Sequence, residues 1–323
     1  MTRAILKVGP LAATSVNNIA TTQSPGAASQ LVLNGTLGTA TANNICTTQT
    51  ITGATALTIN GTLSQTLVWT AATGALIGIT PQYIYITSAG NDSGITFAVV
   101  GLTTGNVRVT ETSTGANTAV APSASKYIAI ISITASGSTA AGVTVGTWGA
   151  ATLDTPRRVL ITTGSAISFT ITGTDWAGDS ISETVTNAGA SVASVLSYAT
   201  VTSISTSASG TSITVGTNGI ADSPWVHWDT WSPNGLAIQG NATGTVNYTL
   251  FFSQDSPNSA TGATSAASVN WISSNSPIVG ATGNVQGTMA LPFIWAKVTL
   301  NSETAGAGNF ASVTIDQLGN VMF

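Results

Sequence analysis

The feature that most constrains the fold of this chain is internal repetition near its start. The tract Asn17–Gln23 recurs as Asn43–Gln49, and Leu33–Leu37 recurs as Ile59–Leu63, both at one spacing and without a gap. Each copy contains an alternating apolar run that ends in Asn-Gly, a pair that favours positive φ and a tight hairpin turn. The repeat therefore predicts two short strands, each of which runs into a turn.

A longer repeat occupies the middle of the chain. Thr80-Pro81 opens its first copy, and Thr155-Pro156 opens its second. The other matches follow in the same order: Ile95–Phe97 with Ile167–Phe169, Val109–Thr112 with Ile181–Thr184, Tyr127 with Tyr198, Ser132-Ile133 with Ser203-Ile204, and Val143–Gly149 with Ile213–Gly219. Because the offset drifts by only a few residues, as loop insertions and deletions produce, these are two copies of one domain.

Within each long copy, apolar and small polar residues alternate between turn residues, which is typical of β-sandwiches and small barrels. No segment keeps apolar residues at helical spacing for more than about two turns. The sequence predicts an all-β fold of tandem antiparallel β-sandwich domains with an extended N-terminal β arm. The predicted parts are an N-terminal arm with two short β repeats at 1–78, β-sandwich repeats at 79–150 and 151–221, and a C-terminal β-sandwich at 222–323.

The predicted arm is rich in Gly, Thr and Asn, so it buries little apolar surface alone. A segment of this kind becomes ordered when it packs on a neighbour. We therefore expect the arm to pair with another subunit or with a larger shell, and we expect the protein to form a symmetric oligomer, a trimer.

Charge is scarce: the 323 residues include 7 Lys and Arg, 11 Asp and Glu, one His and one Cys. The cations are scattered, whereas nucleic-acid binding needs clustered Lys and Arg, and no apolar run is long enough to span a bilayer. We expect neither nucleic acid nor a membrane as partner, and no cofactor or metal. Cys46 stands where the other short copy has Ala20, which predicts a small packing residue rather than a nucleophile.

Catalysis by paired carboxylates needs two acids in one cleft with different environments. Glu111 and Glu183 are the best candidates by pattern, but they hold equivalent positions in separate repeats, so a shared structural role such as bonding a turn amide explains them more simply. Asp175–Asp179 has the form of a hairpin turn with acidic ends rather than a calcium loop. No Gly-x-Ser-x-Gly elbow surrounds a serine. We predict no catalytic residue and a protein that is not an enzyme.

The only His lies in a Trp-rich segment between the second repeat and the C-terminal part. If the segment is extended, one face carries Trp225, His227, Asp229 and Trp231. One interpretation makes this face a sugar platform, with Trp for stacking and His and Asp for hydroxyls. The favoured one buries Trp at the domain junction, with His227 and Asp229 paired at its edge. These four residues are the candidate interaction surface.

Several tracts resemble structural proteins of tailed bacteriophage particles. They are Ile167–Asp175, Ser180–Val185, Ile213–Gly219, Ser223–Trp225, Gly244–Thr249, Ala290–Phe293 and Val313–Ile315. The resemblance covers roughly Thr80 to the C-terminus, and it transfers no catalytic residue.

What the resemblance implies is a non-enzymatic virion component, such as a capsid decoration (cement) protein, a head fibre, or a neck or tail accessory. Such a protein would be assembled in the host cytoplasm, and its partners would be itself and the major capsid protein or other virion proteins. The alternative is a neck, tail or fibre module that binds host surface glycans. A third class, an enzyme such as a depolymerase, requires at least two close acids in an exposed groove.

Overall fold

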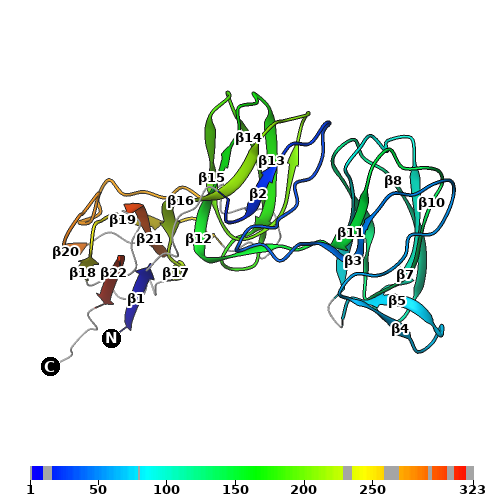
Figure 1. The fold of residues 1–323 in the computed structure, drawn as a ribbon. Helices are drawn as coiled ribbons and strands as arrows, with labels where there is room; N and C mark the ends of the chain where they lie inside the picture. Colours follow the sequence, from blue (N-terminus) through cyan, green and yellow to red (C-terminus); the bar gives the residue numbers. More distant parts are fainter. Residues whose placement is uncertain are drawn as a thin grey trace.

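A computed structural model of the chain describes residues 2–9, 17–78, 81–227, 235–257, 269–289, 293–303 and 309–317. Within these ranges every regular element is a β-strand and all strand pairing is antiparallel, so the all-β prediction is confirmed. The strands form three units in a row (Figure 1). Unit 1 contains the first long repeat, unit 2 contains the second, and unit 3 contains the C-terminal part of the chain.

Unit 1 consists of two sheets with strand orders β3-β11-β6-β9 and β4-β5-β10-β7-β8. Its strands are β3 (Thr41–Gln49), β4 (Ser64–Leu67), β5 (Ala72–Leu76), β6 (Gln82–Ser88), β7 (Thr96–Leu102), β8 (Arg108–Thr114), β9 (Val120–Tyr127), β10 (Ala129–Ala135) and β11 (Val143–Thr147). Alternate residues of β7 and β11, such as Phe97, Val99 and Val145, are fully buried in the core between the sheets. The alternation seen in the sequence therefore marks the inward face of each strand.

Unit 2 repeats this arrangement with fewer strands. They are β2 (Ala20–Gln23), β12 (Ala151–Thr162), β13 (Ser168–Thr174), β14 (Ser180–Thr186), β15 (Ser191–Thr206) and β16 (Ile213–Asp222). The long strand β15 pairs with β12 through its first part and with β13 through its second. It thus replaces both β9 and β10 of unit 1, which pair with β6 and β7.

Unit 3 contains the sheet β1-β22-β18-β20 and the antiparallel strands β17, β19 and β21. Their bounds are β1 (Thr2–Val8), β17 (Val226–His227), β18 (Leu236–Thr243), β19 (Val246–Ser253), β20 (Val285–Met289), β21 (Trp295–Glu303) and β22 (Phe310–Gln317). The end of β16 pairs with β21, Ala221 opposite Leu300, so one sheet continues from unit 2 into unit 3.

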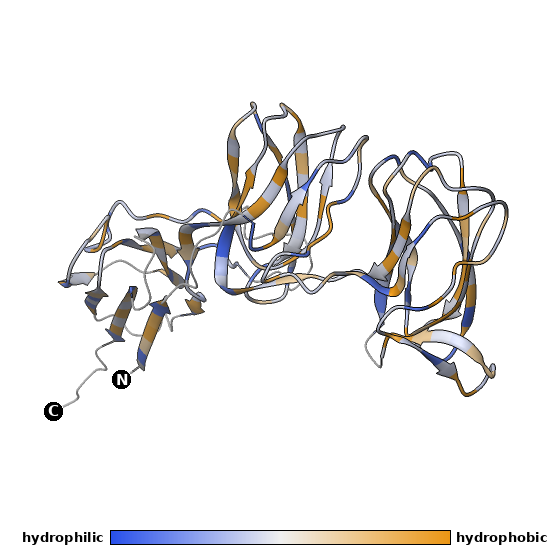
Figure 2. Cartoon of the chain, in the orientation of Figure 1, coloured by the Kyte–Doolittle hydropathy of each residue, from blue (hydrophilic) through white to orange (hydrophobic). Residues whose placement is uncertain are grey.

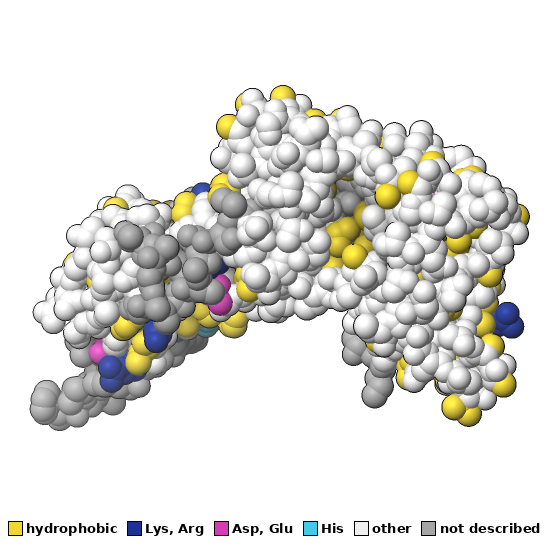
Figure 3. Space-filling view, in the orientation of Figure 1, with side chains coloured by type: hydrophobic (Ala, Val, Ile, Leu, Met, Phe, Trp, Pro, Cys, Tyr) yellow, Lys and Arg dark blue, Asp and Glu magenta, His cyan; other side chains and the backbone are white. Residues whose placement is uncertain are grey.

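Apolar residues lie on the strands of all three units (Figure 2), and they form a separate core cluster in each. The surface is different. On the face drawn in Figure 3, charged side chains are sparse and most of the area is backbone or uncharged polar groups. Each unit therefore has its own hydrophobic core, and the face drawn in Figure 3 carries few charges.

The N-terminal strands are extended, as predicted, but they pair inside the chain. Strand β1 pairs with β22 in unit 3, β2 pairs with β16 in unit 2, and β3 pairs with β11 in unit 1. The chain thus passes through the three units once outward and once back. Each of these strands therefore pairs on one side within the chain, and β1 and β3 are end strands of their sheets. The contact of residues 1–78 with another subunit stays a prediction.

The N-terminal strands extend the units beyond the predicted domain ranges. The continuous ranges 79–150, 151–221 and 222–323 each omit the strands that the N-terminal segment contributes. The first short repeat packs in unit 2, with the second long repeat. The second short repeat packs in unit 1, with the first long repeat. This reversed order follows from the outward and return path of the chain.

Matching side chains of the two short repeats fasten them to their units. Asn44 donates from Nδ2 to Oγ1 of Thr147 at 2.7 Å and accepts the backbone N–H of Thr147 at 3.0 Å. In unit 2, Asn18 donates to the equivalent Oγ1 of Thr217 at 2.8 Å. That oxygen also accepts a bond from the fully buried guanidinium of Arg157. The same Asn–Thr contact therefore closes both sandwiches.

The Asn-Gly pairs do not form the predicted hairpin turns with positive φ. Neither Gly35 nor Gly61 is among the described glycines with positive φ. Instead, a Cβ at either position would overlap the backbone of Asn18 or Asn44. These glycines are needed because two backbone segments approach each other closely, which the turn rule did not anticipate.

The two asparagines give a matched test of this fastening. Asn44→Ala removes both bonds to Thr147, whereas Asn18→Ala leaves Thr217 bonded to Arg157. We expect Asn44→Ala to lower the free energy of unfolding by about 2 kcal/mol and Asn18→Ala by about 1 kcal/mol. Urea unfolding of the full chain measures both values. Wild-type stability for Asn44→Ala would contradict the proposed fastening.

Candidate functional site

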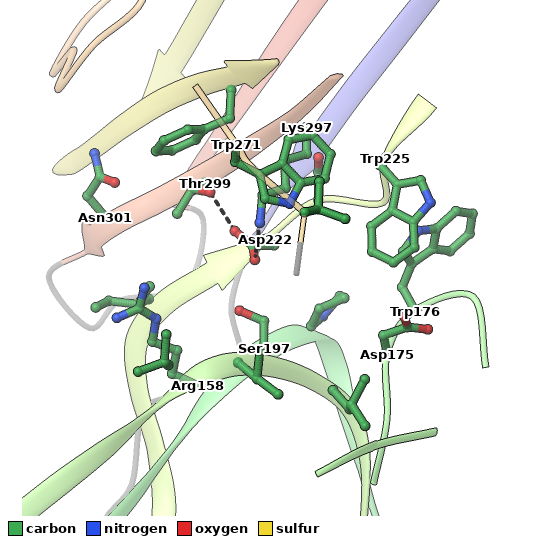
Figure 4. A pocket seen from close by; sticks show the side chains of 18 residues that line it. Arg158, Asp175, Trp176, Ser197, Asp222, Trp225, Trp271, Lys297, Thr299 and Asn301 are labelled. Atoms are coloured by element: carbon green, nitrogen blue, oxygen red, sulfur yellow. Dashed lines mark hydrogen bonds and ion pairs between the residues drawn. The ribbon is translucent and has the colours of Figure 1, made fainter. Parts of the chain in front are cut away.

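A cavity of about 360 Å³ lies where unit 2 meets unit 3; we call it the junction cavity. Side chains from both units line it (Figure 4). Asp175 and Trp176 come from the turn between β13 and β14, and Trp225 comes from the segment before β17. The wall contributed by unit 3 includes Trp271, which precedes β20, and Lys297 on β21.

Asp175 shapes the turn that carries Trp176. One carboxylate oxygen, Oδ1, accepts the backbone N–H groups of Ala177 and Asp179 at 2.9 and 3.0 Å, and Gly178 has a φ of 89°. The interpretation of Asp175–Asp179 as a turn is therefore confirmed. The other oxygen, Oδ2, is buried and has no hydrogen-bond partner among the described residues. Burial raises the pKa of this carboxyl.

The equivalent turn of unit 1 forms without these two residues. There Thr103 donates its backbone N–H to Val107, as Asp175 does to Asp179, and Asn106 has a positive φ, as Gly178 has. The register of the long repeat places Thr103 and Thr104 where unit 2 has Asp175 and Trp176. Only the copy that faces unit 3 carries the acid and the indole.

An ion pair crosses the junction. Nζ of Lys297 on β21 lies 2.9 Å from Oδ2 of Asp222 at the end of β16, and both side chains are about 15% exposed. Thr299 donates its hydroxyl to Oδ1 of Asp222. Burial raises the pKa of Asp222, but the charge of Lys297 and the bond from Thr299 outweigh it and hold the pKa below its ordinary value. The ionised Asp222 therefore links β16 of unit 2 to β21 of unit 3.

Of the predicted interaction surface, Trp225 and His227 fall in the described chain. Trp225 is 8% exposed and packs edge-on against Trp176, with ring centroids 5.5 Å apart. His227 is exposed, and its ring lies 4.7 Å from that of Trp295. The two side chains thus have different aromatic partners. Asp229 and Trp231 lie outside the described residues.

The sequence pattern did not identify four residues as parts of this site: Trp176, Asp222, Trp271 and Lys297. Trp176 carried a usable signal, because it is a point of difference between two otherwise similar repeats. Lys297 carried none, since it reaches Asp222 only through the long-range pairing of β16 with β21.

The two glutamates singled out in the repeats have the predicted structural role. Glu111 accepts two successive backbone N–H groups of β9, at 3.1 and 2.8 Å. Glu183 accepts the equivalent two N–H groups of β15, at 2.9 and 3.1 Å. Glu111 thus joins β8 of one sheet to β9 of the other, and Glu183 joins β14 to the first part of β15.

Cys46 is a packing residue, as predicted. It is fully buried in the core of unit 1, and Ala20 is buried at the equivalent position of unit 2. Burial raises the pKa of the Cys46 thiol to about 12. The thiol is therefore protonated and unreactive at neutral pH.

Comparisons with protein-family models, curated proteins and solved structures find no match for this chain. Across the described ranges, no three His, Cys, Asp or Glu side chains are grouped so that they could hold a metal ion. The same part of the chain contains no helix of the length and hydrophobicity that a bilayer span requires.

The ion pair predicts a dependence of stability on pH. Because the folded-state pKa of Asp222 is lowered, its contribution is fully present above the unfolded value of about 3.9 and is lost as the pH falls through the folded value. Asp222→Asn should cost about 3 kcal/mol at pH 7, and the deficit should shrink on acidification.

Asp316→Asn is the matched control. Asp316 pairs with Arg3 at 3.5 Å with both side chains well exposed, so we expect a loss below about 1 kcal/mol. Thermal unfolding between pH 7 and pH 3 measures both variants. Equal losses at pH 7, or a deficit for Asp222→Asn that does not change with pH, would contradict the assigned role.

Proposed function

We propose that this protein is a non-enzymatic structural component of a tailed-phage particle that decorates or stabilises the capsid through its β-sandwich units. The observation that carries the proposal is the path of the chain, which runs through three units and returns (Figure 1). The resemblance of its strand sequences to phage structural proteins gives the proposal its setting.

The double path supports a stiff, projecting shape. Units 1 and 2 are joined by two chain segments, 38–40 and 148–150, rather than by one flexible linker. Trp148 adds a bond across this joint, because its Nε1 donates to the carbonyl oxygen of Thr202 at 3.1 Å. Units 2 and 3 share a continuous sheet. A row of units held in this way resists bending and suits an element that stands on a surface.

The use of charge also favours a structural role. Glu111 and Glu183 each hold backbone N–H groups, and Asp222 holds a lysine and a threonine. These acids stabilise the fold. Asp222 shares the junction cavity with Asp175, but Lys297 and Thr299 hold its carboxylate.

Contacts with other subunits and with the shell would use open sheet edges, because an edge strand leaves one side of its ladder unpaired. Strands β8 and β14 are edges of their sheets, and exposed Thr residues such as Thr112 and Thr184 lie along them. Edges of this kind accept a further strand. We propose that such contacts also form the symmetric oligomer, a trimer.

Density-gradient fractions of a phage lysate that contains the protein test this proposal. We expect an antibody against the recombinant chain to detect it in the particle band, and cryo-EM of that band to reveal three-lobed rods at regular positions on the particle. Particles disrupted and re-banded provide the control for adhering protein. A protein found only in the particle-free fractions would contradict the proposal.

A further inference from the structure

We propose that the junction cavity is a saccharide-binding site, in which the Trp176 indole stacks on a sugar ring and the Asp175 carboxylate accepts sugar hydroxyl groups. The proposal does not depend on the location of the protein in a phage particle. It rests on the described walls of the cavity between units 2 and 3 (Figure 4).

The first argument is an aromatic surface left open to solvent. Trp176 is 41% exposed although it packs on Trp225, and Trp271 forms another part of the wall. At the other joint, between units 1 and 2, Trp148 is only 8% exposed and packs edge-on against Tyr85. An indole whose sole role is to seal a joint is covered in this way. Trp176 keeps accessible apolar surface, as stacking on a sugar requires.

The second argument is the buried Asp175 oxygen without a partner. Asp175 is 2% exposed, and its Oδ2 has no hydrogen-bond donor among the described residues. Leaving such an oxygen unpaired is costly. The turn itself does not require it, because unit 1 builds the same turn with Thr103. A hydroxyl group of a ligand supplies the missing donor.

The remaining wall fits a neutral polar ligand. Asp222 and Lys297 neutralise each other at 2.9 Å, and Arg158 adds one positive charge against the one negative charge of Asp175. Ser197 and Asn301 add side chains that both donate and accept hydrogen bonds. The volume of about 360 Å³ lies at the lower end of the range for small-molecule sites, so a segment of one or two sugar rings is the matching ligand.

Binding of an immobilised panel of neutral oligosaccharides, built from glucose, galactose, mannose and N-acetylhexosamine units, tests the proposal with the full chain. A second set of uronic-acid and sialic-acid oligosaccharides tests for an acidic ligand. We expect the wild-type chain to retain at least one neutral member, and Trp176→Ala and Asp175→Asn each to weaken that binding at least tenfold.

Matched variants separate binding from folding. Trp69→Ala removes a 53% exposed indole from unit 1, and Asp179→Asn removes the other acid of the same turn; both should bind as the wild type does. Asp175→Asn keeps the oxygen that accepts Ala177 and Asp179, so it should unfold at or above the wild-type temperature while losing the ligand.

Three results would overturn the proposal. They are retention of no saccharide by the wild type, equal binding by Trp176→Ala, and retention of the acidic set alone. Each of these leaves the particle-band experiment unaffected, so the two proposals fail independently.

Discussion

The pairing of the short N-terminal repeats with strands far along the chain is the constraint on which the rest of the structure depends. Strand β3 completes the sheet of unit 1 beside β11, and β2 completes the sheet of unit 2 beside β16. Ile19 and Ile45 from these repeats are fully buried in the two cores. Each sandwich therefore closes only when chain from both passes is present, which couples the folding of neighbouring units.

The few charged side chains have defined structural roles in this arrangement. Among the described charged groups, Glu111 and Glu183 each bond the backbone of a neighbouring strand. Asp222 pairs with Lys297 between units 2 and 3, and Arg157 pairs with Asp154 inside unit 2. Asp175 lines the junction cavity with one buried carboxylate oxygen that has no partner among the described residues, and the equivalent turn of unit 1 has no acid. The binding role proposed for Asp175 rests on this contrast between the two turns.

The sequence pattern predicted the features that depend on residues close together in the chain. The alternation of apolar residues identified strands of the long repeats, but the runs at 31–33 and 57–59, which the short repeats predicted as strands, are not strands. The duplicated Glu111 and Glu183 identified a structural carboxylate, because that signal repeats in the sequence. The partners of β2 and β3 were not predictable in this way, since strand pairing over such separations leaves no local trace. The junction cavity was missed for the same reason: Asp175 and Lys297 are brought to it by different units. Of the predicted surface, only Trp225 lines it among the described residues.

The central claim, that the short repeats pair within their own chain, has a direct chemical test. Cys46 on β3 lies opposite Val145 on β11, and both side chains are buried. Val145→Cys therefore introduces a second thiol beside the only native one. We expect oxidative refolding of this variant to give a disulfide within a single chain, with monomer mass on a non-reducing gel and, on digestion, a peptide pair that links Cys46 to position 145. The wild type, with one Cys, forms no such bond. Disulfide-linked dimers joined through Cys46 and position 145 would contradict the account.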